Sequence, residues 1–285
     1  MNLEQILSPQ RLTSVVDIGA NPIDGVPPYK PLLDRGLCKL IGFEPQQEPL
    51  KKLNELKGPL ERYLPTAIAD GSHHTLHVCR ASGMTSLLEP NKQYLQLFSD
   101  FPGLATKVTT EPVATKRLDD VDEIDSLDFL KVDAQGAEFD IIRYGRSKLA
   151  ATVAIHIEVR FITFYHNEAP IGLIDTELRS LGLIPHCFVS IKRWPIAPVV
   201  IDSTPRKPLH QILGADMLYV KDFSRFENMS AEQWKHLAII AHYCYGSIDL
   251  TYRALAALVS LGAIRPDGTT QYLENLKKAA ETKQS

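Results

Sequence analysis

Short apolar runs alternate with segments of helical period up to about residue 220 of the chain. The runs are rich in β-branched and aromatic residues and have the length of strands. Strands are predicted at 14–18, 37–43, 63–69, 75–80, 107–116, 127–132, 152–159, 184–191 and 215–220. Helices are predicted at 27–35, 49–56, 136–144 and 171–181. This alternation predicts an α/β fold with a mostly parallel sheet.

The pattern changes beyond Asp222, where three helical segments follow one another without a strand. They are predicted at 231–245, 248–261 and 270–280. We therefore divide the chain into an α/β domain, 1–222, and a helical C-terminal extension, 223–285. The middle helix is apolar on more than one face, so it should be buried against the main domain or against a second copy of the chain.

Composition excludes several classes of partner. The formal net charge of −3 argues against non-specific binding of nucleic acid. The four cysteines form no C-x-x-C pair and fit reduced thiols in a cytoplasmic protein. No signal peptide is recognisable at the start, and no apolar run reaches about 18 residues, so no membrane partner is expected.

The first chemical signal follows the first predicted strand. Val15, Val16 and Ile18 form a strand buried on both faces, and Gly19 permits a sharp turn after it. Such a turn can present free backbone N–H groups to a nucleotide at the carboxyl edge of a sheet. The next glycine is Gly25, so the full glycine fingerprint of dinucleotide enzymes is absent. A plain strand-to-loop glycine is the alternative.

Acidic residues follow two further strands. Glu44 comes about 25 residues after Gly19, close to the spacing at which a carboxylate holds ribose hydroxyls. Asp133 ends the strand at 127–132, and Glu138 follows in the next helical turn. A solvent-facing acid at Glu44, a helix cap at Asp133 and a dipole partner at Glu138 are the structural alternatives.

The strand at 152–159 carries polar side chains on one face. His156 and Glu158 share that face with Arg160, while the residues between them are apolar. A buried histidine is more often a satisfied core group than a catalyst. Its position with Glu158 near the carboxyl end of a strand favours a functional role.

These motifs together resemble one enzyme family. Asp17-Ile-Gly-Ala-Asn21, Gly42-Phe-Glu44-Pro45, Leu130-Lys-Val-Asp133-Ala-Gln-Gly136-Ala-Glu138 and Ile157-Glu158 occur in the order typical of FkbM-type S-adenosylmethionine-dependent methyltransferases. The resemblance covers roughly residues 12–222. It implies the Rossmann-like class I methyltransferase sheet, with seven strands and the last one antiparallel. It also implies O-methylation of a sugar, a polyketide or another small-molecule hydroxyl.

The resemblance implies roles for seven residues. Asp17, Gly19, Asn21 and Glu44 would hold S-adenosyl-L-methionine. Asp133, His156 and Glu158 would serve as the base that removes the hydroxyl proton, or as an oxygen-rich metal site. Only two carboxylates are evident for a metal, so we assign no metal ligand.

Two features depart from the family pattern. Pro22-Ile-Asp-Gly-Val-Pro-Pro stands where a shorter glycine-containing loop is expected, and the helical extension lies outside the family core. The extension could bring copies of the chain together in a homo-oligomer. We expect a small-molecule or glycan acceptor, bordered by the segment 192–208, in which Trp194 would stack on a sugar.

Two other functions fit parts of the pattern. A nicotinamide-dependent oxidoreductase would share the sheet but needs the missing glycines. A non-catalytic cofactor-binding module would use the helical extension to recruit a partner.

Replacing Glu44 by glutamine should weaken binding of the methyl donor by about 1.5–3 kcal/mol, because one charged hydrogen bond to the ribose is lost. Isothermal titration calorimetry with S-adenosylhomocysteine measures the change. An unchanged affinity would contradict the ribose assignment.

Overall fold

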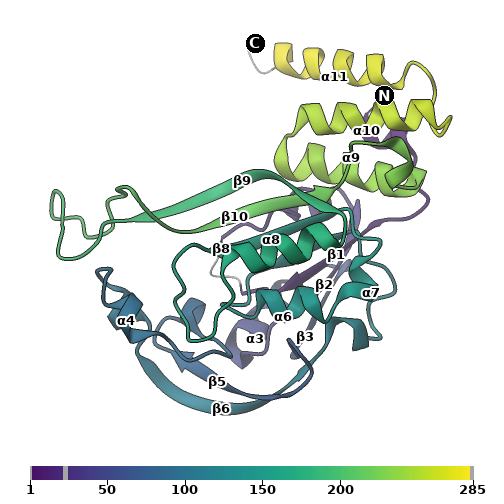
Figure 1. Ribbon diagram of the computed structural model, residues 1–285. Coiled ribbons are helices and arrows are strands. Elements are labelled where there is room, and N and C mark those ends of the chain that lie inside the picture. The colour runs from purple at the N-terminus through teal and green to yellow at the C-terminus, as the bar shows by residue number, and fades with distance from the viewer. Residues whose placement is uncertain (1, 22–24, 283–285) are drawn as a thin grey trace.

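The computed structural model describes residues 2–21 and 25–282 (Figure 1). Its described residues form a central seven-stranded sheet of order β3-β2-β1-β7-β8-β10-β9. The strands are β1 (Thr13–Ile18), β2 (Cys38–Phe43), β3 (Glu61–Leu64), β7 (Phe129–Val132), β8 (Ala154–Arg160), β9 (Leu183–Trp194) and β10 (Gln211–Lys221). β10 is antiparallel to both of its neighbours, and the other pairs are parallel. The predicted α/β fold with a Rossmann-like sheet is confirmed.

The strand order changes direction next to β1. From β1 the chain builds outward to β2 and β3, and then returns to place β7 on the other side of β1. Ile18 pairs with Phe43 of β2 and with Val132 of β7. The residues that follow these three strand ends therefore emerge side by side, at the switch point where open α/β sheets bind ligands.

Both faces of the sheet are covered by helices, because successive strand residues point to opposite faces. Val15 belongs to one apolar cluster, with α1 (Leu3–Leu7), α2 (Lys30–Asp34), α9 (Ala231–Tyr245) and α10 (Ile248–Ser260). Val16 and Ile18 belong to another, with α6 (Glu138–Arg143), α7 (Arg146–Leu149) and α8 (Ile171–Ser180). The strands are buried on both faces, as their continuous apolar runs predict.

The predicted strand at 63–69 is divided between two sheets. Its first part is β3, and its second is β4 (Ala67–Ile68), which joins β5 (His73–Cys79) and β6 (Lys107–Lys116). Pro65 lies at the break and has no N–H to continue a ladder. The small sheet lies below the central one in Figure 1.

A third apolar cluster lies beyond the carboxyl edge. It joins the short helices α4 (Lys92–Leu95) and α5 (Phe101–Leu104) to Phe164, which follows β8. β9 and β10 are longer than the predicted 184–191 and 215–220, and Figure 1 shows their hairpin extending away from the sheet. Trp194, at the end of β9, packs against this cluster.

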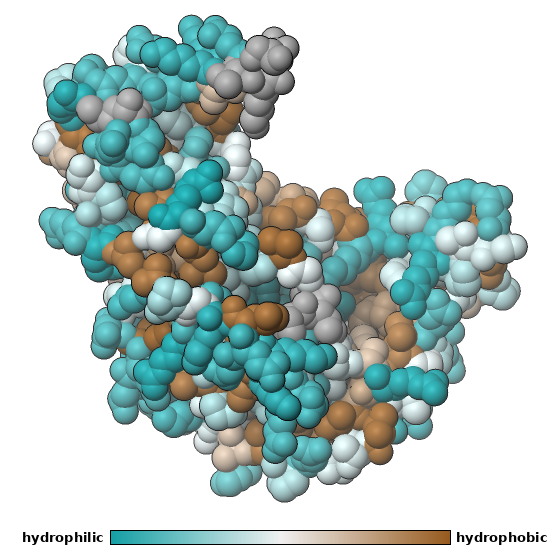
Figure 2. Space-filling view, turned by 180° about the vertical axis from the view of Figure 1, so that it is seen from behind, coloured by the Kyte–Doolittle hydropathy of each residue, from teal (hydrophilic) through white to brown (hydrophobic). Residues whose placement is uncertain are grey.

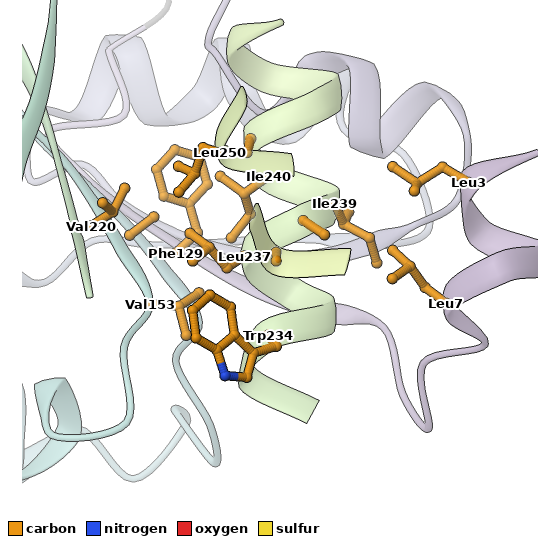
Figure 3. Packing of buried hydrophobic residues seen from close by; sticks show 14 of the residues in the cluster. Leu3, Leu7, Phe129, Val153, Val220, Trp234, Leu237, Ile239, Ile240 and Leu250 are labelled. Atoms are coloured by element: carbon orange, nitrogen blue, oxygen red, sulfur yellow. The ribbon is translucent and has the colours of Figure 1, made fainter. Parts of the chain in front are cut away.

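The C-terminal helices share the core of the α/β domain. On α9, Trp234 and Leu237 are fully buried and lie with Phe129, Val153 and Val220 of the sheet in one cluster (Figure 3). α10 packs on α9, and α11 (Gly268–Thr282) packs on α10. The helix nearest the sheet is thus α9, with the predicted middle helix covering it. The domain boundary at 222 and an oligomer formed through these helices stay predictions.

Within residues 2–21 and 25–282, no helix combines the length and the apolar character needed to cross a bilayer.

Leu237→Ala should lower the free energy of unfolding by about 2–5 kcal/mol, because the cavity it leaves lies between α9 and the sheet. Urea denaturation measures the loss. Leu173→Ala is the matched control, since that helical leucine of α8 is 50% exposed, and it should change stability little. Equal losses in both variants would show that α9 is not part of the core.

Candidate functional site

A close backbone contact forms the centre of the candidate site. Gly19 has φ +80°, and a Cβ atom there would lie 1.9 Å from the carbonyl oxygen of Asp133. Only glycine fits, because both the backbone angle and the space exclude a side chain. The N–H groups of Gly19 and Ala20 both donate to the carbonyl of Phe43, at 3.0 and 3.1 Å. The prediction that this turn presents free N–H groups is therefore wrong at these two positions, and the next helix begins only at Lys30.

A cavity opens at the carboxyl ends of β1, β2 and β7, and we call it the edge cavity; its empty space, including the part open to solvent, is about 670 Å³. Gly19, Asn21, Glu44 and Asp133 all line it. Glu44 is 2% exposed and accepts a hydrogen bond of 2.8 Å from the N–H of Gln46. Apolar side chains form much of the remaining lining, from Phe43, Ala67, Ile68, Leu76 and Leu87.

A larger cavity lies beside it, with about 1370 Å³ of empty space including the part open to solvent, and we call it the polar cavity. Its ionisable lining residues other than tyrosines are Asp17, Lys30, Glu61, Lys131, Asp133, His156, Lys192 and Asp216. Among the described residues, Asn21 and Asp133 line both cavities. The structure thus places these two residues where the cavities meet.

Asp17 lies on the side of the polar cavity. It is 2% exposed, accepts a hydrogen bond of 2.6 Å from the hydroxyl of Tyr29, and lies 3.1 Å from Nζ of Lys131. In the register of the sheet, Lys131 of β7 lies opposite Asp17 of β1 and opposite His156 of β8. The three side chains therefore point to one face of the sheet. Asp17 is therefore separated from Glu44, and its role toward the cofactor stays a prediction.

His156 is held neutral in this polar row. Its Nδ1 lies 2.9 Å from the hydroxyl of Tyr245, which comes from α9. Burial lowers the pKa of His156 to about 4, Asp216 opposes that shift, and Lys131 adds to it. A neutral imidazole in the polar cavity can accept a hydrogen bond or a proton. The sequence patterns around His156 do not indicate Tyr245 as its partner.

Three carboxylates meet behind Asp133. The nearest oxygens of Asp133, Glu138 and Glu158 lie within 4.8 Å of one another. Both oxygens of Glu138 accept backbone N–H groups, from Ala134 at 2.8 Å and from Gly136 at 2.9 Å. Burial raises the pKa of Glu138 to about 8, helped by the charges of Glu158 and Asp133.

Cations neutralise Glu158. Arg160 lies 2.6 Å from one of its oxygens, and Lys192 pairs with the other. Gln135 donates hydrogen bonds to Asp133 at 2.5 Å and to Glu158 at 3.2 Å, and so joins the two carboxylates. Burial raises the pKa of Glu158, and Arg160 opposes that shift.

Two carboxylates are evident for a metal site from the sequence, and the structure brings three together. Their oxygens are nevertheless engaged by backbone N–H groups, by Gln135 and by two cations. This donor set fits a buried ion-pair network better than a cation site. Gln135 and Lys192 are its members that motif spacing did not assign to the site.

The segment 192–208 reaches the site through its first residue only. Lys192 lines the polar cavity, as expected of a segment that leaves the carboxyl edge. Trp194 lines neither cavity. Its ring lies 4.9 Å from that of Phe101 and 5.4 Å from the guanidinium of Arg206, and its indole N–H donates to Ser99. These contacts give Trp194 a packing role in place of the predicted stacking on a sugar.

Comparison with known proteins identifies relatives of the chain. The family model described as "Methyltransferase FkbM domain" matches residues 17–184. The 2-O-methyltransferase NoeI of Sinorhizobium fredii (strain NBRC 101917 / NGR234) is 28% identical over 184 residues, which cover 60% of this chain and 72% of that protein.

Two solved structures are similar at low identity. Precorrin-6y C5,15-methyltransferase from Geobacter metallireducens GS-15 has a TM-score of 0.38 and 11% identity, covering 77% of this chain and 86% of that one. Magnesium protoporphyrin IX methyltransferase from Synechocystis PCC 6803, solved with bound S-adenosylmethionine, has a TM-score of 0.36 and 9% identity, covering 77% and 76%.

The lowered pKa of His156 makes stability depend on pH. The folded protein resists protonation between its pKa of about 4 and the ordinary value of 6.5, while the unfolded chain takes up the proton. The contribution of the neutral His156 to the free energy of unfolding is therefore fully present above pH 6.5 and is lost as the pH falls toward 4. Between pH 7.5 and pH 5, the titration of this group should lower the free energy of unfolding by about 2 kcal/mol.

The free energy of unfolding of His156→Gln should fall by about 2 kcal/mol less than that of the wild type over that pH interval. Urea denaturation at both pH values measures the difference. His73→Gln is the control, because His73 is exposed at the start of β5, and its pH dependence should match that of the wild type. If the free energy of unfolding of the His156 variant fell with pH as much as that of the wild type, His156 would not be neutral in the folded protein.

Proposed function

The chain belongs to the FkbM methyltransferase family and uses S-adenosyl-L-methionine, and on that premise we propose that it methylates a hydroxyl group of a sugar or a similar small molecule. Family membership sets aside the nicotinamide-dependent and non-catalytic alternatives.

One observation carries it: the edge cavity and the polar cavity meet at Asn21 and Asp133. A cofactor in one cavity and an acceptor in the other would be adjacent at that point. Methyl transfer requires the donor and the accepting oxygen to be held in line at near-attack distance. Two cavities with a shared border supply that arrangement.

The edge cavity fits the adenosine half of the cofactor. Its apolar side chains suit a flat base, and the buried carboxylate of Glu44 can accept two hydrogen bonds from a ribose diol. Asn21 lies at the border, where it can contact the methionine half. Gly19 contributes by keeping the loops after β1 and β7 in contact.

When bound, the cofactor supplies a methyl group already activated by its sulfonium. The residues of this chain then have two tasks, which are to orient the acceptor hydroxyl and to receive its proton. We assign the proton to Asp133, because its carboxylate lines both cavities. Transfer would form the new C–O bond as the S–C bond of the cofactor breaks, with S-adenosylhomocysteine as the leaving product. His156, neutral and in the polar cavity, is assigned to hydrogen-bonding the acceptor.

Glu158 is assigned a positioning role. Its oxygens are held by Arg160, Lys192 and Gln135, and it lines neither cavity. Through Gln135 it acts on the orientation of Asp133. The sequence indicates Glu158 as a candidate base, and these contacts favour the indirect role.

The choice of a sugar hydroxyl has two supports. The described relative is named a 2-O-methyltransferase. The polar cavity presents carboxylates, lysines and the hydroxyl-bearing side chains of Tyr29 and Tyr63, a lining suited to an acceptor with several hydroxyl groups.

The proposed function is tested with labelled S-adenosylmethionine and a panel of methyl glycosides of hexoses and deoxyhexoses. Label should appear as a methyl ether on at least one sugar. Amine and carboxylic acid acceptors complete the panel, and transfer to them with none to any hydroxyl would refute methylation of a hydroxyl group.

Asp133→Asn should lower kcat on such an acceptor by about 10²–10⁴-fold, because the proton acceptor is lost. Affinity for S-adenosylhomocysteine should change little, since the substitution keeps the shape of the side chain. Asp216→Asn is the control within the polar cavity, because Asp216 does not line the edge cavity. It should raise the acceptor KM and leave kcat near the wild-type value. A normal kcat in Asp133→Asn would remove this residue from catalysis.

A further inference from the structure

Apolar residues at the mouth of the polar cavity are unusually exposed. Val26 is 81% and Leu56 is 82% exposed, the two highest values among the large apolar residues of the described chain. Both line the polar cavity. Figure 2 shows apolar surface of this kind in patches between polar side chains on one face of the molecule. Single exposed apolar residues are ordinary, whereas a group of them around one cavity marks a binding surface.

The helix α3 (Gln47–Leu56) forms part of this mouth. Leu50, Leu53 and Leu56 follow at intervals of three residues and so lie along one side of the helix. Such a side is normally buried against a core. All ten residues of α3 are described, and none of them is buried. Two of the three leucines, Leu53 and Leu56, line the polar cavity instead.

The polar cavity therefore has two chemically different parts. Its floor is the row of polar side chains on the sheet that includes Asp17, Lys131 and His156. Its apolar wall, as we call it from here on, consists of Val26, Pro27, Pro28, Leu33, Leu53 and Leu56. The wall comes from α2, α3 and the loop before α2, and it is continuous with the floor.

We propose that the acceptor carries an aliphatic chain beside its hydroxyl-bearing group, and that this chain lies along the apolar wall. The inference rests on the proposed function, because the floor is taken as the place of the reacting hydroxyl. A free sugar would occupy the floor and leave the wall in water. The wall consists of aliphatic side chains and prolines, so it matches an alkyl or acyl chain in shape and polarity. Each methylene that leaves water there raises affinity about fourfold, which corresponds to about 0.8 kcal/mol.

The test compares two probes that differ only in their chain. Full-length protein saturated with S-adenosylhomocysteine is titrated calorimetrically with n-octyl β-D-glucopyranoside, below its critical micelle concentration, and with methyl β-D-glucopyranoside. The octyl glucoside should bind at least about tenfold more tightly, which requires only two methylenes to be buried.

Leu53→Ser and Leu56→Ser should each reduce that advantage about threefold or more and leave the methyl glucoside unaffected, because each removes part of the wall. Both positions are outside the core, so the variants keep the fold. Val108→Ser is the matched control. Val108 is 70% exposed on β6 and lines neither cavity, so its loss should change neither affinity.

Equal affinities for the two glucosides in the wild type, or no binding of the octyl glucoside, overturns the inference. An equal loss in Val108→Ser also overturns it, since the chain would then bind apolar surface in general. These outcomes are independent of methyl transfer. A chain-dependent affinity together with no transfer to any hydroxyl would instead refute the proposed function alone.

Discussion

The contact between the backbones of Gly19 and Asp133 is the constraint on which the rest of the site depends. A Cβ atom at Gly19 would come 1.9 Å from the carbonyl oxygen of Asp133, so the loops after β1 and β7 meet only because position 19 has no side chain. Their meeting brings Asn21 and Asp133 to the border of two cavities. The nearby N–H groups of Gly19 and Ala20 bind Phe43 and so tie the loop to β2 as well. Gly19 thus contacts the residues at the ends of β2 and β7 as well as following β1.

The face of the sheet behind this contact combines an apolar core with a row of polar side chains. Toward the amino ends of the strands, Val15 and Phe129 pack against α9. Toward the carboxyl ends, the same face carries Asp17, Lys131 and His156. Burying charges costs free energy unless they are paired. Here the buried groups have partners close by. Asp17 is hydrogen-bonded to Tyr29 and Lys131, and Nδ1 of the neutral His156 is hydrogen-bonded to the hydroxyl of Tyr245.

A similar balance organises the carboxylates behind Asp133. Glu158 is matched by Arg160 and Lys192, and Glu138 by two backbone N–H groups. Gln135 joins this network to Asp133. The result is a fixed, largely charge-balanced environment in which Gln135 orients the carboxylate of Asp133. The apolar wall on the other side of the polar cavity adds a surface with no charge at all.

The sequence by itself determined the order of strands and helices, the antiparallel last strand expected from the family resemblance, and the identity of residues at strand ends. Glu44 and Asp133 could be predicted at the ligand edge because each directly follows an apolar run, and the period of a run shows where its strand ends. The break after β3 was missed, although Pro65 is its local signal.

Only the tertiary structure decided which distant side chains meet. Tyr245 reaches His156 across 89 positions of the chain, and Lys192 reaches Glu158 across 34. It also separated Asp17 from Glu44, packed Trp194 against Phe101, and left one side of α3 facing a cavity. Periodicity reports whether a residue is buried and on which face it lies. It carries no information on the partner across that face, because the partner depends on strand order and on how helices from elsewhere in the chain pack against the sheet.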